Sequence, residues 1–300
     1  MKFNHTLFRT CTGLFACSLL LTACVEEEKP AEDTVETVEV KKSDEALAGQ
    51  IVKFEGEIFS IPSPVQTAIL IQTSEVPYDE SLLNDKDNAD TYINQFQKAM
   101  NMGVYGADLA YLSNFNNIAL SIDYFNIVES LADDLGIKNN IDPMLMIRFH
   151  DNMSNRDSLY AINAELYQEI NQYLKDNERN EAASLILAGG WIEGLNISVN
   201  AAKIDSTIRQ RVGEQQSALN SLVAIMSKYD DPQVNEFRGG LNELAEIYSG
   251  MERSYTYVKP ITDPTGKTTY INSKTRVVVS DEELVQIEEK VKEIRQIIIG

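Results

Sequence analysis

Residues Ala182 to Leu195 read AASLILAGGWIEGL, a run with almost no polar face. A helix that is apolar on all sides is typical of a protein interior, whereas a surface helix carries a single apolar stripe. At 14 residues the run is too short to span a bilayer as a helix. The sequence therefore predicts a buried central helix around which the rest of the chain packs.

Four other segments show the period of an amphipathic helix. In each segment, apolar residues recur every three or four positions and so line one helix face. The four faces are Ile118, Ile122, Phe125, Leu131 and Leu135; Leu159, Ile162, Leu166, Ile170 and Leu174; Phe237, Leu241, Leu244 and Tyr248; and Leu284, Ile287, Val291, Ile294 and Ile298. We expect these helices to pack their apolar faces on the central one.

Capping residues mark where several helices begin. Asp142-Pro143 and Asp231-Pro232 each place a capping side chain before a Pro at the first helical position. Ser63-Pro64-Val65-Gln66 and Ser280-Asp281-Glu282-Glu283 have the pattern of a capping box. These four sites predict helix N-termini.

One region near the C-terminus departs from the helical pattern. Tyr255–Val258 and Thr269–Ile271 flank the turn sequence Asp263-Pro264-Thr265-Gly266, and Val277–Val279 follow. Alternating strand formers around a Pro-Gly turn predict a flap of two or three strands at about residues 254–279. For Ile51–Ile61, helix and strand both remain open. The predicted fold is mostly α, a multi-helix bundle or stacked helical hairpins with a small β-hairpin near the C-terminus.

The N-terminus has the pattern of an export signal. Lys2 and Arg9 precede an apolar stretch of 14 residues, Thr10 to Ala23, which predicts a signal peptide over residues 1–23. The stretch ends in Leu21-Thr22-Ala23-Cys24, which resembles a bacterial lipobox, so we expect the Cys24 thiol to carry a diacylglycerol. The alternative is an ordinary secretory signal followed by an incidental Cys.

An acidic segment follows Cys24. From Val25 to Glu45 the chain reads VEEEKPAEDTVETVEVKKSDE, with nine acidic and three basic residues, a composition typical of disorder. We expect residues 24–45 to be a tether between the lipid and a single helical domain at residues 46–300. The run Glu26–Glu28 is similar to export signals of surface lipoproteins in the Bacteroidetes, and a solvated spacer is the alternative.

Charge and composition exclude several classes of function. Removal of the signal peptide takes Lys2 and Arg9 from the 26 basic residues and leaves 24 against 46 acidic ones, a net charge of -22. Such a charge repels nucleic acid. The mature chain keeps one histidine, His150, and one cysteine, Cys24, which excludes a Cys nucleophile, a Cys-rich zinc site and a multi-His metal site. No nucleotide-binding Gly-rich motif is present, so we expect neither a metal nor a cofactor.

Two Gly-bearing segments carry a family resemblance. They are Gly103-Val104-Tyr105-Gly106-Ala107-Asp108-Leu109-Ala110-Tyr111 and Gly189-Gly190-Trp191-Ile192-Glu193-Gly194-Leu195. Together with the Ser63-Pro64 helix start, they resemble a family of helical Bacteroidetes lipoproteins over roughly Ile61 to Gly300. The resemblance implies a mostly helical fold in the cell envelope and implies no particular activity or ligand.

The same two segments hold the candidate site. Their small residues, among them Gly103 and Gly190, predict that two helices cross backbone to backbone. Asp108 and Glu193 lie beside these small residues, and carboxylates are rarely buried unless they are paired or hydrogen-bonded. If the two carboxylates are paired, their pKa values separate, as general acid and base catalysis requires.

Other side chains complete the candidate site. Tyr105, Tyr111 and Trp191 are candidates for an aromatic wall against a sugar or peptide, and Asn196 extends the Glu193 face, as does Asn200. The alternative function is therefore a carboxylate-dependent hydrolase of glycan or peptide using Asp108 and Glu193.

The favoured function is non-catalytic. We expect a lipid-anchored scaffold in the outer membrane, on its periplasmic or cell-surface face. The expected partners are the membrane, through the N-terminal lipid, and a protein or small ligand of the envelope.

Overall fold

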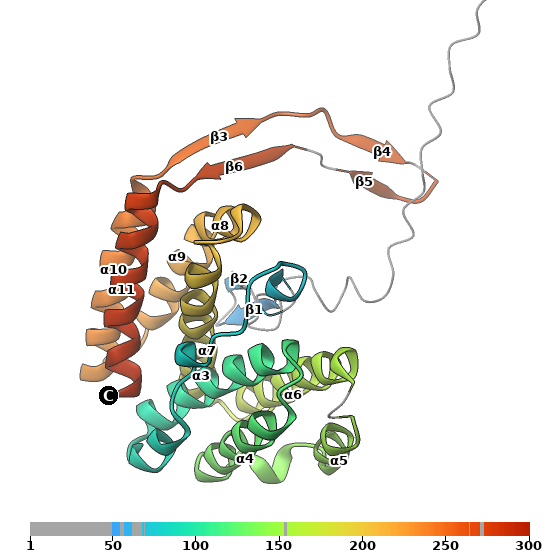
Figure 1. The fold of residues 1–300 in the computed structure, drawn as a ribbon, viewed down its shortest axis with the longest axis vertical. Helices are drawn as coiled ribbons and strands as arrows, with labels where there is room; N and C mark the ends of the chain where they lie inside the picture. The colour runs from blue at the N-terminus through green and yellow to red at the C-terminus, as the bar shows by residue number, and fades with distance from the viewer. Residues whose placement is uncertain are drawn as a thin grey trace, which may run out of the picture. The chain divides into compact units, whose positions relative to one another are not determined.

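The apolar run lies inside α7 (Asn180–Ala201), which is buried on all its sides, as predicted. Five helices pack against it: α3 (Gln95–Asn114), α6 (Arg156–Asp176), α8 (Ser206–Gly213), α9 (Gln216–Met226) and α11 (Asp281–Ile299) (Figure 1). Within the described chain, α7 is the one helix long and apolar enough to cross a membrane. However, 83% of its most apolar window is buried inside the protein, as in the core helix of a soluble domain.

The computed structural model describes residues 50–54, 57–61, 68, 70–152, 155–263, 265–270 and 273–300. These residues fall in one compact unit, Lys41–Gly300. The predicted signal peptide, Cys24, the acidic tether and the helix start at residues 63–66 lie outside the described residues.

Helices α3 and α7 cross with their backbones in contact, which confirms the crossing predicted from the Gly-bearing segments. A Cβ atom on Gly103 would lie 2.0 Å from the carbonyl oxygen of Ile186, and one on Gly189 would lie 2.0 Å from that of Met100. Any side chain at either position would push the helices apart. The close crossing brings residues on the facing sides of α3 and α7 together.

The remaining helices cover this pair. Helix α4 (Ile118–Asp134) packs on α3, α5 (Pro143–Asp151) on α6, and α10 (Pro232–Ser249) lies beside α11 (Figure 1). Three short 3-10 helices complete the helical elements: η1 (Glu80–Leu82) and η2 (Lys86–Thr91) precede α3, and η3 (Lys138–Asn140) lies between α4 and α5. The predicted apolar faces of α6, α10 and α11 are buried throughout.

The predicted face of α4 needs a correction at its N-terminal end. Ile118 is exposed and Ile122 is only half-buried, whereas Ser121 and Tyr124 are buried. The buried stripe includes Tyr124, whose hydroxyl donates a hydrogen bond to the backbone oxygen of Asn84 at 2.6 Å. The spacing of apolar residues in the sequence gives no sign of this polar contact.

Three of the predicted helix starts are confirmed. Asp142 accepts a hydrogen bond from the backbone of Met144, and Asp231 accepts one from that of Gln233. Ser280 and Glu283 form the complete capping box at the start of α11.

The strands form hairpins. Strands β1 (Gln50–Phe54) and β2 (Glu57–Ile61) pair antiparallel, so the ambiguous segment is strand. Near the C-terminus, β3 (Glu252–Thr256) pairs with β6 (Lys274–Val278), and β4 (Ile261–Asp263) pairs with β5 (Thr268–Tyr270). The predicted hairpin is therefore present. It is two-stranded along its described length, because Val277 and Val278 belong to the returning strand and do not form a third one.

Candidate functional site

Asp108 of α3 and Glu193 of α7 meet beneath the helix crossing. Both side chains are buried, each residue with 0% of its surface exposed. The Glu193 Oε2 atom accepts a hydrogen bond from Nε of Arg295, on α11, at 2.6 Å. The structure thus brings the two candidate carboxylates together and adds an arginine that pairs with Glu193.

Asp108 is the member of the pair whose protonated form is favoured. Burial raises the pKa of Asp108 well above 3.8, and the negative charge of Glu193 raises this pKa further. Its Oδ2 atom accepts the backbone N–H of Asn84 at 3.0 Å, while Oδ1 is buried and accepts no hydrogen bond among the described residues. A proton on this carboxyl group makes it a donor toward Glu193, which leaves the cluster with one anion and one cation.

Arg295 keeps its charge in this surrounding. Burial by itself lowers the pKa of Arg295, but the adjacent Glu193 carboxylate raises it overall. Its Nη2 atom also donates to the backbone oxygen of Leu82 at 3.2 Å. A buried ion pair is tolerated when such additional hydrogen bonds satisfy the charged groups.

Asn84 connects the carboxylates to a wider polar network. Its side-chain amide donates to the Tyr92 hydroxyl at 2.9 Å and to Asn101 Oδ1 at 3.3 Å. Asn101 in turn donates to the backbone oxygen of Ile298 at 2.8 Å. The network therefore ties the segment before α3 to α3 and α11, and it holds the carboxylates in fixed positions.

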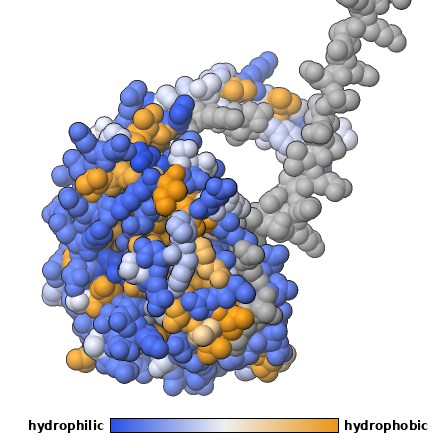
Figure 2. Space-filling model, in the orientation of Figure 1, coloured by the Kyte–Doolittle hydropathy of each residue, from blue (hydrophilic) through white to orange (hydrophobic). Residues whose placement is uncertain are grey.

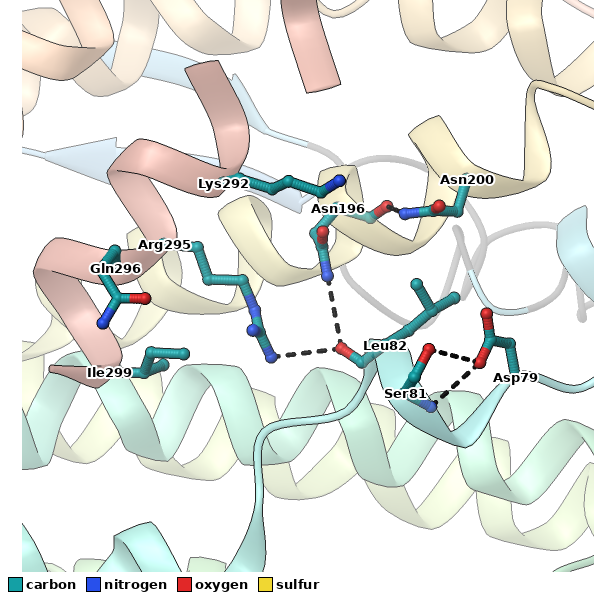
Figure 3. Close-up of a pocket in the computed structure, with 9 residues that line it drawn as sticks. All are labelled: Asp79, Ser81, Leu82, Asn196, Asn200, Lys292, Arg295, Gln296 and Ile299. Carbon is teal, nitrogen blue, oxygen red and sulfur yellow. Dashed lines mark hydrogen bonds between the residues drawn. The ribbon is translucent and has the colours of Figure 1, made fainter. Parts of the chain in front are cut away.

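A pocket of about 420 Å³ lies beside the buried ion pair. Its lining comes from the η1 segment, α7 and α11, and consists of Asp79, Ser81, Leu82, Asn196, Asn200, Lys292, Arg295, Gln296 and Ile299 (Figure 3). Arg295 joins the two features, because its guanidinium group pairs with Glu193 and also lines the pocket.

The charged side chains of this lining are two cations, Lys292 and Arg295, and one carboxylate, Asp79. Arg295 and Asn196 converge on the backbone oxygen of Leu82, and Asn200 Nδ2 donates to the backbone oxygen of Asn196 at 3.1 Å (Figure 3). Oδ1 of the carboxylate Asp79 already accepts the backbone N–H and the hydroxyl of Ser81. Across the described residues, no group of three or more His, Cys, Asp or Glu side chains is placed to hold a metal ion.

The predicted aromatic wall is wrong. The Tyr105 hydroxyl donates to the backbone oxygen of Asp85 at 2.7 Å, and the Tyr111 hydroxyl accepts the backbone N–H of Asp79 at 3.0 Å. The indole of Trp191 donates to Gln215 at 3.2 Å. All three rings are buried in the core and none lines the pocket, because each polar end finds a partner inside the protein.

Asn196 is the predicted ligand-binding residue that the structure does place at the pocket, and Asn200 lies one turn further along α7. Sequence reasoning missed Lys292 and Arg295. The available signal was the position of Arg295 directly beside Ile294 and three residues before Ile298, at the margin of the apolar face of α11. An arginine at the margin of an apolar face can equally point into solvent, so the sequence did not identify Glu193 as its partner.

Comparison with known proteins adds no relative: no family model, curated protein or solved structure matches this chain. The geometry of the site is thus the basis for its interpretation.

Proposed function

We propose that this protein is a non-catalytic binding protein of the bacterial envelope, anchored in the outer membrane by a lipid on Cys24. Its helical domain binds a small ligand rich in hydrogen-bond acceptors in the pocket between η1, α7 and α11. The observation that carries this proposal is the presence of two cations, Lys292 and Arg295, in the pocket lining against the single carboxylate of Asp79.

The donors define the chemical class of the ligand. A guanidinium group has five N–H donors, and the described residues use two of those on Arg295, through Glu193 and Leu82. Lys292, whose ammonium pairs with Glu288, has two further N–H donors, and Asn200 and Gln296 add amide groups around the same space. Such a site suits a compact hydroxy acid or sugar acid, whereas the overall charge of -20 disfavours a polyanion.

The burial of Asp108 and Glu193 favours binding over catalysis. A general acid or base acts only within hydrogen-bonding reach of its substrate. Both carboxylates are fully buried, and Glu193 is already paired with Arg295. The described geometry therefore does not favour the hydrolase that the sequence suggested.

Thermal denaturation in the presence of small acids tests the pocket. The polypeptide Val25–Gly300 keeps every described residue, and the probes are glucuronate, galacturonate and lactate, with glucose as the neutral comparison. We expect at least one acid to raise the Tm of the wild type, because a ligand that binds only the folded state stabilises it. Lys292→Met should abolish the shift.

Lys290→Met is the matched control. Lys290 lies one half-turn away on the same helix, pairs with Glu243 and Glu293, and is absent from the pocket lining. This variant should keep the full ligand-induced shift. The proposal is contradicted if no acid changes the Tm of the wild type, or if Lys292→Met responds as the wild type does.

A further inference from the structure

The hairpin between α10 and α11, residues 252–278, forms an arm with a fixed root. Val277 and Val279 are buried, and a Cβ atom on Gly213 of α8 would lie 2.9 Å and 2.6 Å from their side chains. Arg253 donates from Nη2 to the backbone oxygen of Tyr248 at 2.9 Å. The root is therefore packed on the helical domain.

Beyond its root the arm is exposed. Every residue from 252 to 262 is exposed, and large side chains stand in solvent along both strands. Tyr255 is 65% exposed, Tyr257 67%, Ile261 61% and Tyr270 53%. Figure 2 shows hydrophobic and hydrophilic residues side by side on this part of the molecule. Because an isolated two-stranded ribbon is only marginally stable in water, a surface that covers it would stabilise it.

The arm differs in charge from the rest of the chain. Residues 252–278 contain five Lys and Arg against two Asp and Glu, a net charge of +3. The other residues together carry -23, which gives the chain its total of -20. From Glu252 to Asp263 an extended strand covers roughly 35 to 40 Å at about 3.3 Å per residue. This length exceeds the Debye length of about 8 Å at physiological salt, so the tip is screened from the acidic helices.

We propose that the arm binds a bilayer surface with anionic headgroups. Tyr side chains are enriched at the membrane interface, where the ring is buried and the hydroxyl stays in water. Lys and Arg near such a surface are attracted to the anionic headgroups. Tyr257 and Tyr270 supply the rings, and Lys259 and Lys267, both exposed, supply the charges.

The distribution of side chains favours a lipid surface over a second copy of the chain. A stable protein interface buries about 800 Å² on each partner around a packed apolar centre. On the arm the exposed apolar side chains are spread along two thin strands and alternate with Thr, as at Thr256 and Thr269. A headgroup layer accommodates such scattered rings without a complementary shape.

Vesicle flotation tests this proposal independently of the lipid on Cys24. The polypeptide Val25–Gly300, which lacks that residue, is mixed with vesicles of phosphatidylcholine alone or of an equimolar mixture with phosphatidylglycerol. We expect binding to the mixed vesicles only. The double variant Lys259→Glu and Lys267→Glu should weaken it about 25-fold or more, because each Lys near an anionic surface contributes about fivefold.

Two further variants separate the arm from general charge. Lys86→Glu with Lys138→Glu makes the same change in net charge on the helical domain, where both Lys residues form exposed ion pairs, and should leave binding close to that of the wild type. Tyr257→Ser with Tyr270→Ser keeps the charge and should weaken binding several-fold.

Three outcomes would overturn the proposal. They are absence of binding to the anionic vesicles, equal loss from both charge reversals, and sedimentation as a dimer that the Tyr double variant dissociates. The last result would assign the arm to contacts between copies of the chain.

Discussion

At Asp108, burial and the Glu193 carboxylate both raise the pKa above 3.8, so the folded state holds this proton more tightly than the unfolded state. The resulting stabilisation is complete below pH 3.8 and is lost as the pH rises through the folded-state pKa. Asp108→Asn removes this titration.

The free energy of unfolding of the wild type should therefore fall relative to Asp108→Asn by up to about 1.4 kcal/mol per pH unit between pH 3.8 and the folded-state pKa of Asp108. Urea unfolding of both proteins over a pH series measures the difference. A difference that stays constant with pH would show that Asp108 is ionised in the folded protein.

The sequence located the buried carboxylates but could not identify their partner. Asp108 and Glu193 are recognisable because each lies beside small residues in an apolar helix. Arg295 lies 102 residues beyond Glu193 in sequence, and the backbone oxygen of Leu82 is a pocket group that no side-chain pattern reveals. Contacts between distant segments of this kind follow from the tertiary structure.

At the scale of elements, the crossing of α3 and α7 is the tightest contact described. Gly103→Ala would place a Cβ atom 2.0 Å from the Ile186 carbonyl oxygen, so the helices must separate. We expect a loss of about 3 kcal/mol or more in the free energy of unfolding, as for a severe overpacking change.

Gly239→Ala is the matched control for this prediction. Gly239 lies within α10, and a Cβ atom there would have no neighbour within 4 Å. The change should stabilise the protein by about 0.5 to 1 kcal/mol, because Ala is the better helix former. Denaturant midpoints of the two variants give the comparison, and similar midpoints would contradict the close crossing.

The helices were largely predictable because their signals are local. The apolar faces of α6, α10 and α11 and the caps at Asp142, Asp231 and Ser280 depend only on residues within a few positions. The pairing of β4 with β5 was not predicted. The sequence placed the strand before the turn at Tyr255–Val258, whereas Ile261 is the residue that pairs with Tyr270 of the returning strand. The register of a hairpin depends on the geometry of its turn and on contacts that the sequence pattern leaves open.

At the scale of the whole molecule, the proposed attachment to the membrane depends on one residue, Cys24. We expect Cys24→Ala to move the protein from the membrane fraction to the soluble fraction after a high-salt wash, because the lipid is then absent and salt screens the basic arm. Fractionation of cells that produce either form measures this. A variant that stays in the washed membranes would show that the lipid on Cys24 is not the anchor.

The central claim is that Asp108, Glu193 and Arg295 form a structural network beneath a binding pocket and do not form a catalytic site. The free energies of unfolding of Glu193→Gln and Asp108→Asn at neutral pH test it most directly. Glu193→Gln should lose about 3 kcal/mol, since it leaves the partly buried guanidinium of Arg295 without its counter-charge.

Asp108→Asn should be at least as stable as the wild type at neutral pH, because the amide needs no bound proton to stay uncharged and its oxygen can still accept the N–H of Asn84. If instead Glu193→Gln stabilises the protein, this carboxylate is retained at a cost to stability, as active-site residues often are, and the account is contradicted.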